Sequence, residues 1–236
     1  MNQDDVIAHF RAQVGDEDIP LLWSYEEVQV FLVDAQDMLV RLTGGIADVS
    51  VALADIGSPQ TRLQDLDLTA DNPYGAVSPY ILRLIGGRVL GAQWDITFAN
   101  QGDLGTMRWN DYGWNIGAQL DDTETGDVRY AILGIRDNYV RWMKVPAAAD
   151  TCRIQFRRLP FPRIADSDDP LEISEEHHIH LLKWMKHLAY SKEDSETYDK
   201  KLADSNEAQF RAYADQARKE IERRRFKPRV VQYGGL

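Results

Sequence analysis

The chain has 236 residues, of which 44% are hydrophobic and 28% are charged, a composition typical of globular proteins. This excludes collagen-like and wholly disordered proteins. The single cysteine, Cys152, excludes an intrachain disulfide and a multi-cysteine metal site. No apolar run approaches the ~20 residues that cross a bilayer, and the acidic N-terminus lacks a signal-peptide core. We therefore expect no contact with a membrane.

The net charge of −11 is concentrated in the first third of the chain. Residues 1–71 contain 14 acidic and three basic side chains, whereas the other 165 residues contain 24 of each sign. Sequence-specific DNA binding usually needs a basic face that displaces counterions from phosphate, so this distribution disfavours that function. Residues 218–229 are a local exception, with seven basic and two acidic side chains.

Two helices are predicted in the first 45 residues. Residues 3–13 have an amphipathic pattern, with apolar side chains along one side. The second helix should begin at Ser24, because Ser24 and Glu27 have the spacing of a capping box and Trp23 and Val28 that of a hydrophobic staple. Gly44-Gly45 should end this helix. Its apolar stripe consists of Val28, Phe31, Leu32, Ala35, Leu39 and Leu42.

From about residue 48 to 158 the hydrophobic period changes to two, which predicts short strands. Gly86-Gly87 lies between two such runs and predicts a tight hairpin. Cys152, Ile154 and Phe156 should share one face of the last strand. Short strands with short turns indicate an antiparallel meander rather than βαβ units. The predicted strands lie near residues 49–53, 80–85, 88–97, 127–134, 138–145 and 151–158.

Long helices are predicted again in the last third, because no glycine occurs in residues 135–233 and no proline in residues 171–227. One helix should run over 174–190, with Ser174 as its cap, and a second over 199–224. A short connection, of residues 191–193 or slightly longer, predicts that the two pack antiparallel. The apolar stripe of the second helix consists of Leu202, Phe210, Tyr213, Ala214, Ala217 and Ile221, interrupted by Asn206.

These elements predict an α+β fold. Residues 1–45 form the N-terminal helical part of a bundle, and residues 46–165 form an inserted antiparallel β domain. Residues 166–225 form a C-terminal helical pair that completes the bundle, and residues 226–236 form an extended docking tail.

Motifs of common catalytic sites are missing from the sequence. It contains no P-loop, no GxGxxG, no GxSxG and no HExxH. Asp65, Asp67 and Asp71 have the start of a calcium-loop spacing, but the loop lacks the glycine and the final glutamate that such a loop needs. We therefore expect neither an enzyme nor a cofactor.

Histidines near the start of the first C-terminal helix are the best metal candidates. Residues 175–180 read Glu-Glu-His-His-Ile-His, and His187 follows on the same face as His180. This spacing is compatible with zinc or with a proton switch. We favour a structural role, in which the acids stabilise the helix N-terminus and the imidazoles of His177, His178 and His180 contact a neighbouring chain or the β region.

Aromatic residues are frequent in the β region, and Trp109, Tyr112 and Trp114 lie close together in a predicted loop. Burial in the sheet core is the favoured interpretation. Contact with a protein partner and stacking on a sugar remain alternatives. The full set in the β region is Trp94, Trp109, Tyr112, Trp114, Tyr130, Tyr139 and Trp142.

The last residues combine positive charge with strand-like alternation. The helix macrodipole favours Arg223–Arg225 at a helix C-terminus, but it does not account for the basic residues beyond. Residues 229–233 alternate as a strand does, which favours docking on the sheet edge of another chain. A nucleic-acid contact and a disordered end are the alternatives. The candidate docking residues are Arg225, Phe226, Lys227, Arg229, Val230, Val231 and Tyr233.

Short stretches at both ends of the chain, taken in order, carry a family resemblance. They are Trp23–Val28, Asp34–Gln36, Leu171–Ile173, Leu181–Met185, Leu188–Tyr190, Asp194–Asp199, Phe210, Tyr213 and Arg229–Gly235. Together they resemble the head–tail connector (adaptor) proteins of bacteriophages with short tails.

The resemblance implies a structural virion protein made in the host cytoplasm. Such an adaptor forms a homo-oligomeric ring, typically a dodecamer, that joins the portal to the tail tube or nozzle at the head–tail junction. Residues 226–236 would dock on the portal, and the β region would reach the tail. We also expect the acidic excess to line part of the channel, so that genomic DNA passes during ejection without sequence-specific binding. A tail-associated carbohydrate-binding or host-recognition module is the alternative.

Overall fold

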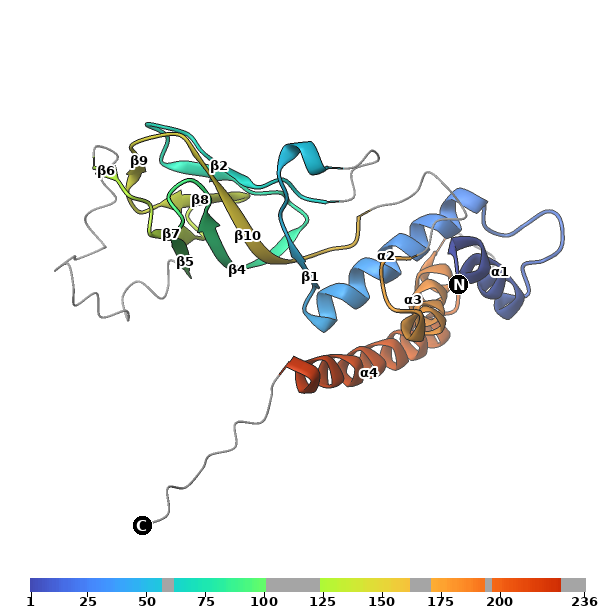
Figure 1. Ribbon diagram of the computed structural model, residues 1–236. Coiled ribbons are helices and arrows are strands. Elements are labelled where there is room, and N and C mark those ends of the chain that lie inside the picture. The colour runs from blue at the N-terminus through green and yellow to red at the C-terminus, as the bar shows by residue number, and fades with distance from the viewer. Residues whose placement is uncertain (57–61, 101–123, 162–170, 194–196, 226–236) are drawn as a thin grey trace, which may run out of the picture. The chain divides into compact units, whose positions relative to one another are not determined.

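The computed structural model describes residues 1–56, 62–100, 124–161, 171–193 and 197–225. These residues divide into two compact units (Figure 1). The helical unit comprises the described residues of Met1–Ile46 and Leu159–Leu236, and the β unit comprises those of Ala47–Arg158. Each unit is described by itself below.

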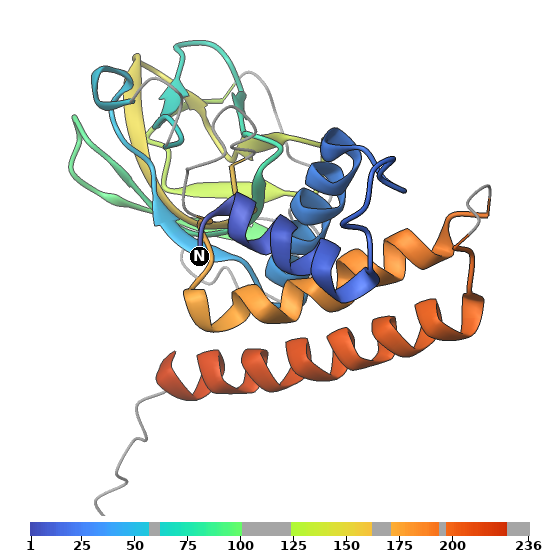
Figure 2. The same ribbon diagram turned by 90° about the vertical axis from the view of Figure 1, so that its right-hand side faces the viewer.

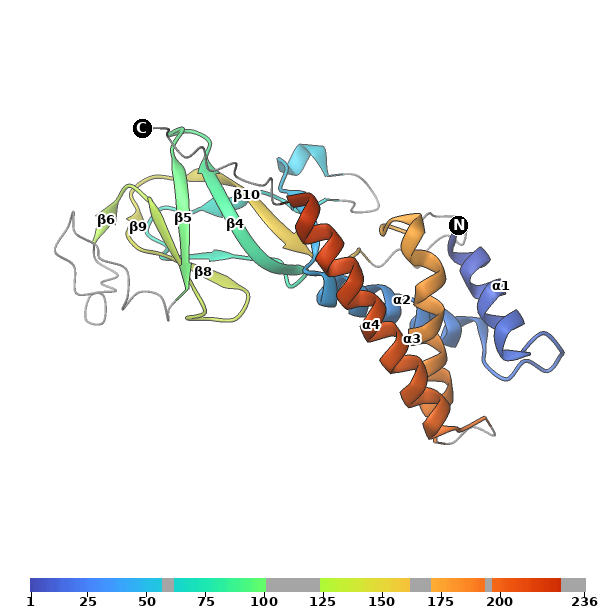
Figure 3. The same cartoon turned by 90° about the horizontal axis from the view of Figure 1, so that it is seen from below.

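The helical unit contains four α-helices within the described residues. They are α1 (Gln3–Val14), α2 (Tyr25–Thr43), α3 (His178–Ser191) and α4 (Lys200–Arg225), with a 3-10 turn, η4 (Glu175–His177), before α3. Figure 2 and Figure 3 show α3 and α4 side by side with opposite directions. Helix α3 contacts each of the other three helices. Its Trp184 donates to a carboxylate oxygen of Asp34 on α2 at 2.6 Å and packs on Phe210 of α4 with ring centroids 5.1 Å apart.

The predicted helices α1 and α2 are confirmed. The Ser24 hydroxyl accepts from the amide of Glu27 at 3.2 Å, as the capping box requires. The Glu27 carboxylate instead binds the ammonium group of Lys192 at 2.7 Å. Gly44 ends α2 in the left-handed conformation, with φ of 89°. Local capping signals therefore predicted where both ends of α2 lie.

Three details of the C-terminal helices differ from prediction. Ser174 precedes a 3-10 turn and makes no side-chain cap, so α3 begins at His178. Helix α3 ends at Ser191 and α4 begins at Lys200, each one residue later than predicted. Leu202 is exposed and its neighbour Ala203 is buried, because one residue turns the helix by about 100°. The buried positions of α4 are Ala203, Asn206, Phe210, Ala214 and Ala217.

The β unit is built on one strongly curled sheet, which has eight strands within the described residues. Its order is β1-β10-β4-β5-β7-β8-β3, and β2 also pairs with β10. Strands β6 and β9 form a separate pair. A 3-10 turn, η1 (Leu53–Asp55), follows β1. The strands are β1 (Ile46–Val49), β2 (Leu66–Leu68), β3 (Tyr74–Ala76), β4 (Ile81–Val89), β5 (Asp95–Asn100), β6 (Thr125–Gly126), β7 (Tyr130–Leu133), β8 (Tyr139–Trp142), β9 (Val145–Pro146) and β10 (Asp150–Arg158).

The predicted antiparallel meander is wrong in part. Most pairs are antiparallel, but β5 pairs with β7, and β6 with β9, in parallel. A parallel pair needs a crossover between its strands, unlike the two-residue turn of a hairpin. The first strand also ends early, because β1 stops at Val49 and Leu53 belongs to η1.

The predicted hairpin at Gly86-Gly87 is wrong, because both glycines lie inside β4. A Cβ on Gly87 would lie 2.9 Å from the sulfur of Cys152, so the strand needs glycine there for close approach. The turn between β4 and β5 lies four residues later. There the Asp150 carboxylate accepts from the amides of Gly91 at 2.9 Å and Ala92 at 3.2 Å.

Side chains of strand β10 lie in the hydrophobic core of the β unit. Cys152, Ile154 and Phe156 are each fully buried, which confirms their predicted common face. Burial raises the pKa of the Cys152 thiol to about 12, so this thiol stays protonated and unreactive at neutral pH.

Candidate functional site

Two predicted interaction sites fall on residues outside the described part of the chain. Arg225 is the last residue of α4, and the other candidate docking residues, Phe226, Lys227, Arg229, Val230, Val231 and Tyr233, lie beyond the described residues. The same is true of Trp109, Tyr112 and Trp114, the candidate tail-protein or sugar contacts. Both sites therefore stay predictions.

The histidines of η4 and α3 pack within the helical unit. The Nδ1 atom of His177 lies 2.7 Å from the hydroxyl of Tyr213 on α4, and the His180 ring stacks on the Tyr213 ring at a centroid distance of 3.4 Å. His187 Nδ1 lies 3.1 Å from the carbonyl of Ala203. The partners found for these three histidines lie on α4, and the expected contacts of His177, His178 and His180 with a neighbouring chain or the β region stay predictions. Within the described residues, no group of three or more His, Cys, Asp or Glu is arranged to hold a metal.

Burial changes the chemistry of this cluster. It lowers the pKa of His177 and of His180 below the ordinary value of 6.5. Nearby positive charge on Lys183 lowers the pKa of His180 further. Both imidazoles are therefore neutral at neutral pH, and they contribute to α3–α4 packing through ring contacts and hydrogen bonds.

The loop between α1 and α2 is anchored by a buried ion pair. The Arg11 guanidinium binds the carboxylate of Asp16, a residue that is only 2% exposed. The second Asp16 oxygen accepts from the amide of Leu22 at 2.6 Å, and Arg11 also donates to the carbonyl of Trp23 at 3.1 Å. The start and the end of the loop are thereby tied to the same side-chain pair.

The tip of this anchored loop is apolar and faces solvent. Ile19 is 92% exposed, Leu22 51% and Leu21 42%. Glu17 and Asp18 are exposed beside them. Exposed apolar side chains that gather in one place mark interaction surfaces more often than isolated ones do. We call residues 16–22 the α1–α2 loop.

A groove of about 620 Å³ lies along β1, β4 and β10 of the β unit. Its apolar lining includes Val49 and Ile85, which are 42% and 52% exposed. Arg62, Arg153 and Arg157 also line it. Guanidinium groups bind carboxylates in a planar, bidentate geometry. We call this feature the arginine groove, and its chemistry suits an apolar ligand that carries carboxylates.

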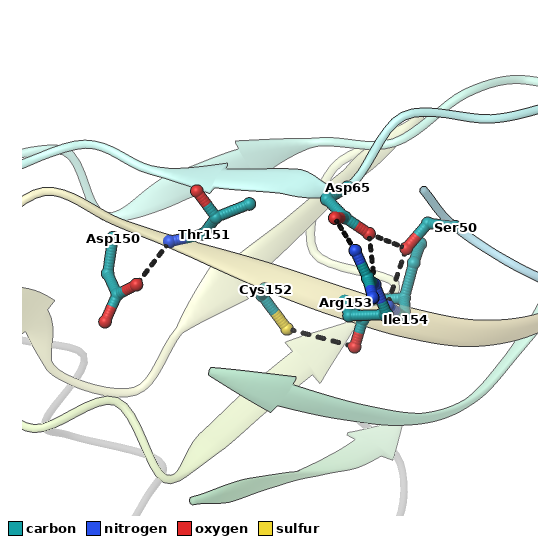
Figure 4. Close-up of polar contacts among 7 residues, drawn as sticks. All are labelled: Ser50, Asp65, Asp150, Thr151, Cys152, Arg153 and Ile154. Atoms are coloured by element: carbon teal, nitrogen blue, oxygen red, sulfur yellow. Dashed lines mark hydrogen bonds and ion pairs between the residues drawn. The ribbon is translucent and has the colours of Figure 1, made fainter. Parts of the chain in front are cut away.

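Hydrogen bonds fix one wall of the arginine groove (Figure 4). The buried carboxylate of Asp65 accepts from Arg153 Nη2 at 3.0 Å and from the hydroxyl of Ser50. The Ser50 oxygen in turn accepts from the amide of Ile154 at 2.8 Å. The bond to Asp65 raises the pKa of Arg153. Arg153 therefore stays charged, and its guanidinium group is held in place by the buried carboxylate of Asp65.

Neither the α1–α2 loop nor the arginine groove was found by sequence reasoning. The loop is short, and the apolar run Ile19-Pro20-Leu21-Leu22 is the feature of the sequence that could have indicated an exposed apolar surface there. The groove joins residues as distant as Asp48 and Arg157, and no spacing in the sequence connects them.

The helices of the described chain are all too short or too polar to span a membrane. The chain thus combines a helical unit and a curled β unit, with exposed apolar side chains at the α1–α2 loop and in the arginine groove. The model of a family described as SU10 adaptor protein matches residues 1–232. The chain therefore belongs to the SU10 adaptor protein family, a family of structural phage head–tail adaptors. A search of curated proteins finds no match to this sequence.

Membership of this family confirms the predicted resemblance to phage head–tail adaptors. The protein is a structural component of the phage virion, and the family associates with other virion components such as the portal and the tail.

Proposed function

We propose that the protein is a ring-forming adaptor that joins the portal to the tail of a short-tailed phage and forms part of the DNA channel. Residues 226–236 dock on the portal, and the β unit faces the tail. The family match across residues 1–232 carries this proposal. The sequence stretches that resemble the connectors of short-tailed phages support the assignment to a short-tailed phage and the ring between portal and tail.

The surface of the helical unit supports self-association. The 26-residue helix α4 buries one narrow stripe and leaves most of its surface open. Tyr198, Leu202 and Ile179 are exposed by 45%, 42% and 46%. A helix with free apolar positions can pack against the same unit of another copy, and head-to-tail contacts between identical copies close into rings.

The charge of the chain supports a role beside passing DNA. Residues 1–71 carry the whole net charge of −11. An acidic wall repels phosphate, so DNA moves past it without binding. This distribution is the opposite of the basic face that DNA-binding proteins use.

The test is assembly with the portal protein of the same phage, followed by mass photometry and negative-stain microscopy. The full chain should form a closed ring on the portal. A chain that ends at Arg225 should lose portal binding, whereas a chain that ends at Tyr233 keeps the docking stretch and should bind normally.

Two outcomes would contradict the proposal. Portal binding that is unimpaired in the chain ending at Arg225 would remove the docking role of residues 226–236. A full chain that forms no ring on the portal would remove the ring.

A further inference from the structure

We propose that the α1–α2 loop of one copy docks into the arginine groove on the β unit of a neighbouring copy. The inference rests on the proposed ring, and it identifies one contact between adjacent copies besides the packing of their helical units. It concerns two surfaces that the docking tail does not use.

The arginine groove has a net positive lining. Arg62, Arg153 and Arg157 line it, together with the acidic Asp48, whose carboxylate is bound by Arg158 at 2.7 Å. The carboxylates of Asp65, bound by Arg153 at 3.0 Å, and of Asp55 act on Arg153 from beside the groove. The guanidinium groups therefore outnumber the carboxylates by four to three. Opposite charge on a partner therefore complements the groove, and it both guides association and sets its register.

The α1–α2 loop has the matching character. Glu17 and Asp18 are exposed carboxylates, and Ile19 is the most exposed large apolar side chain of the described residues. The groove offers apolar surface at Val49 and Ile85 beside its guanidinium groups. Its volume of about 620 Å³ lies in the range of about 300–1,000 Å³ that is usual for ligand sites, so it can take the side chains of a loop tip.

Anchoring makes the α1–α2 loop a suitable ligand. Its backbone is held by the buried Arg11–Asp16 pair and by the bond from Leu22 to Asp16. A loop that is already ordered loses little conformational entropy when it binds. The exposed side chains are therefore presented in a fixed arrangement before any partner arrives.

Charge also discriminates between two segments that could occupy the groove. The C-terminal tail carries Lys227 and Arg229 beside its apolar residues. These cations would face the arginines of the groove, and like charges at an interface oppose binding. The acidic α1–α2 loop meets no such repulsion.

The contact is heterologous, because the loop belongs to the helical unit and the groove to the β unit. Each copy has one loop and one groove, so each can bind two neighbours. Contacts of this kind produce closed rings when the rotation between copies closes.

Disulfide cross-linking between copies tests the contact directly. The double variant I19C/V49C, assembled with the portal and oxidised, should give a ladder of covalent oligomers on a denaturing gel. The native Cys152 is buried and should not contribute. The matched control I19C/L90C places the second thiol at Leu90, exposed but outside the groove lining, and should give no ladder.

Charge reversal gives a second, independent readout. E17R/D18R and R62E/R157E should each weaken self-association by about tenfold or more, and combining them should recover part of the loss. Circular dichroism of each variant checks that it folds.

The outcomes separate this inference from the proposed function. Rings that form on the portal without an I19C/V49C ladder, and with no effect of charge reversal, would overturn the loop contact and leave the ring intact. A ladder in V49C/V230C instead would place the C-terminal tail in the groove and also overturn the inference. A wild-type chain that forms no ring would overturn the proposed function itself.

Discussion

Replacing Asp16 by alanine tests the buried ion pair that anchors the α1–α2 loop. The Asp16 side chain is 1% exposed and the Arg11 side chain 13%. The substitution leaves the Arg11 guanidinium largely buried without its counter-ion and removes the acceptor for the amide of Leu22. Removing one partner of a buried ion pair destabilises a protein by about 3–5 kcal/mol. This is a large fraction of the ~5–15 kcal/mol that stabilises a typical domain.

Urea unfolding of the purified protein, followed by far-ultraviolet circular dichroism, measures this loss. D16A should lower the free energy of unfolding by about 3–5 kcal/mol. D16N should lose less, because its amide oxygen still accepts from Leu22. The matched control E17A changes an exposed carboxylate in the same loop and should stay within about 0.5 kcal/mol of wild type.

A loss below about 1 kcal/mol in D16A, similar to that of a surface substitution, would refute the reasoning. The loop would then not depend on Asp16. The Arg11–Asp16 pair would then not hold the loop in order before it binds a neighbouring copy.

Three other substitutions test side-chain packing inside the β unit and inside the helical unit. G87A should destabilise the β unit by about 1–3 kcal/mol, because the new Cβ lies within 3 Å of a buried sulfur; G86A, with open space around its Cβ, should cost much less, and equal losses would contradict the close approach. F210A should destabilise the helical unit by about 3–5 kcal/mol, since this ring is fully buried, and a loss under 1 kcal/mol would argue against α3–α4 packing. The free energy of unfolding should fall as the pH drops below 6.5, the ordinary pKa of histidine. The pKa of His180 is lowered in the folded protein, so on acidification the unfolded state binds the proton at a higher pH than the folded state does. H180F should reduce this pH dependence in thermal unfolding and H9Q, at an exposed position, should not; identical slopes in both would contradict the burial of His180.

Local signals predicted much of the helical unit. The ends of α2 follow from Ser24 and Gly44, whose roles depend only on neighbours in the chain. The course of α4 follows from its apolar spacing and from the lack of glycine and proline. The observed buried stripe of α4 differs from the predicted one at Leu202, where the neighbouring Ala203 is buried instead. Contacts with the partner helix determine which residues at the border of the stripe are covered.

The β unit was harder to predict because distant residues determine it. Asp150, and not the Gly86-Gly87 pair, stabilises the turn between β4 and β5 from 59 residues away. The β5–β7 pair is parallel, which local periodicity cannot distinguish from an antiparallel pair. The arginine groove depends on a bond between Asp65 and Arg153, 88 residues apart, so its site could not be found from spacing alone.

Single-particle cryo-electron microscopy of the intact virion is the decisive test of the proposed ring between the portal and the tail. We expect a closed ring of this chain at the head–tail junction, with residues 226–236 against the portal. Density for the chain at the distal end of the tail, or single copies without cyclic symmetry, would contradict it.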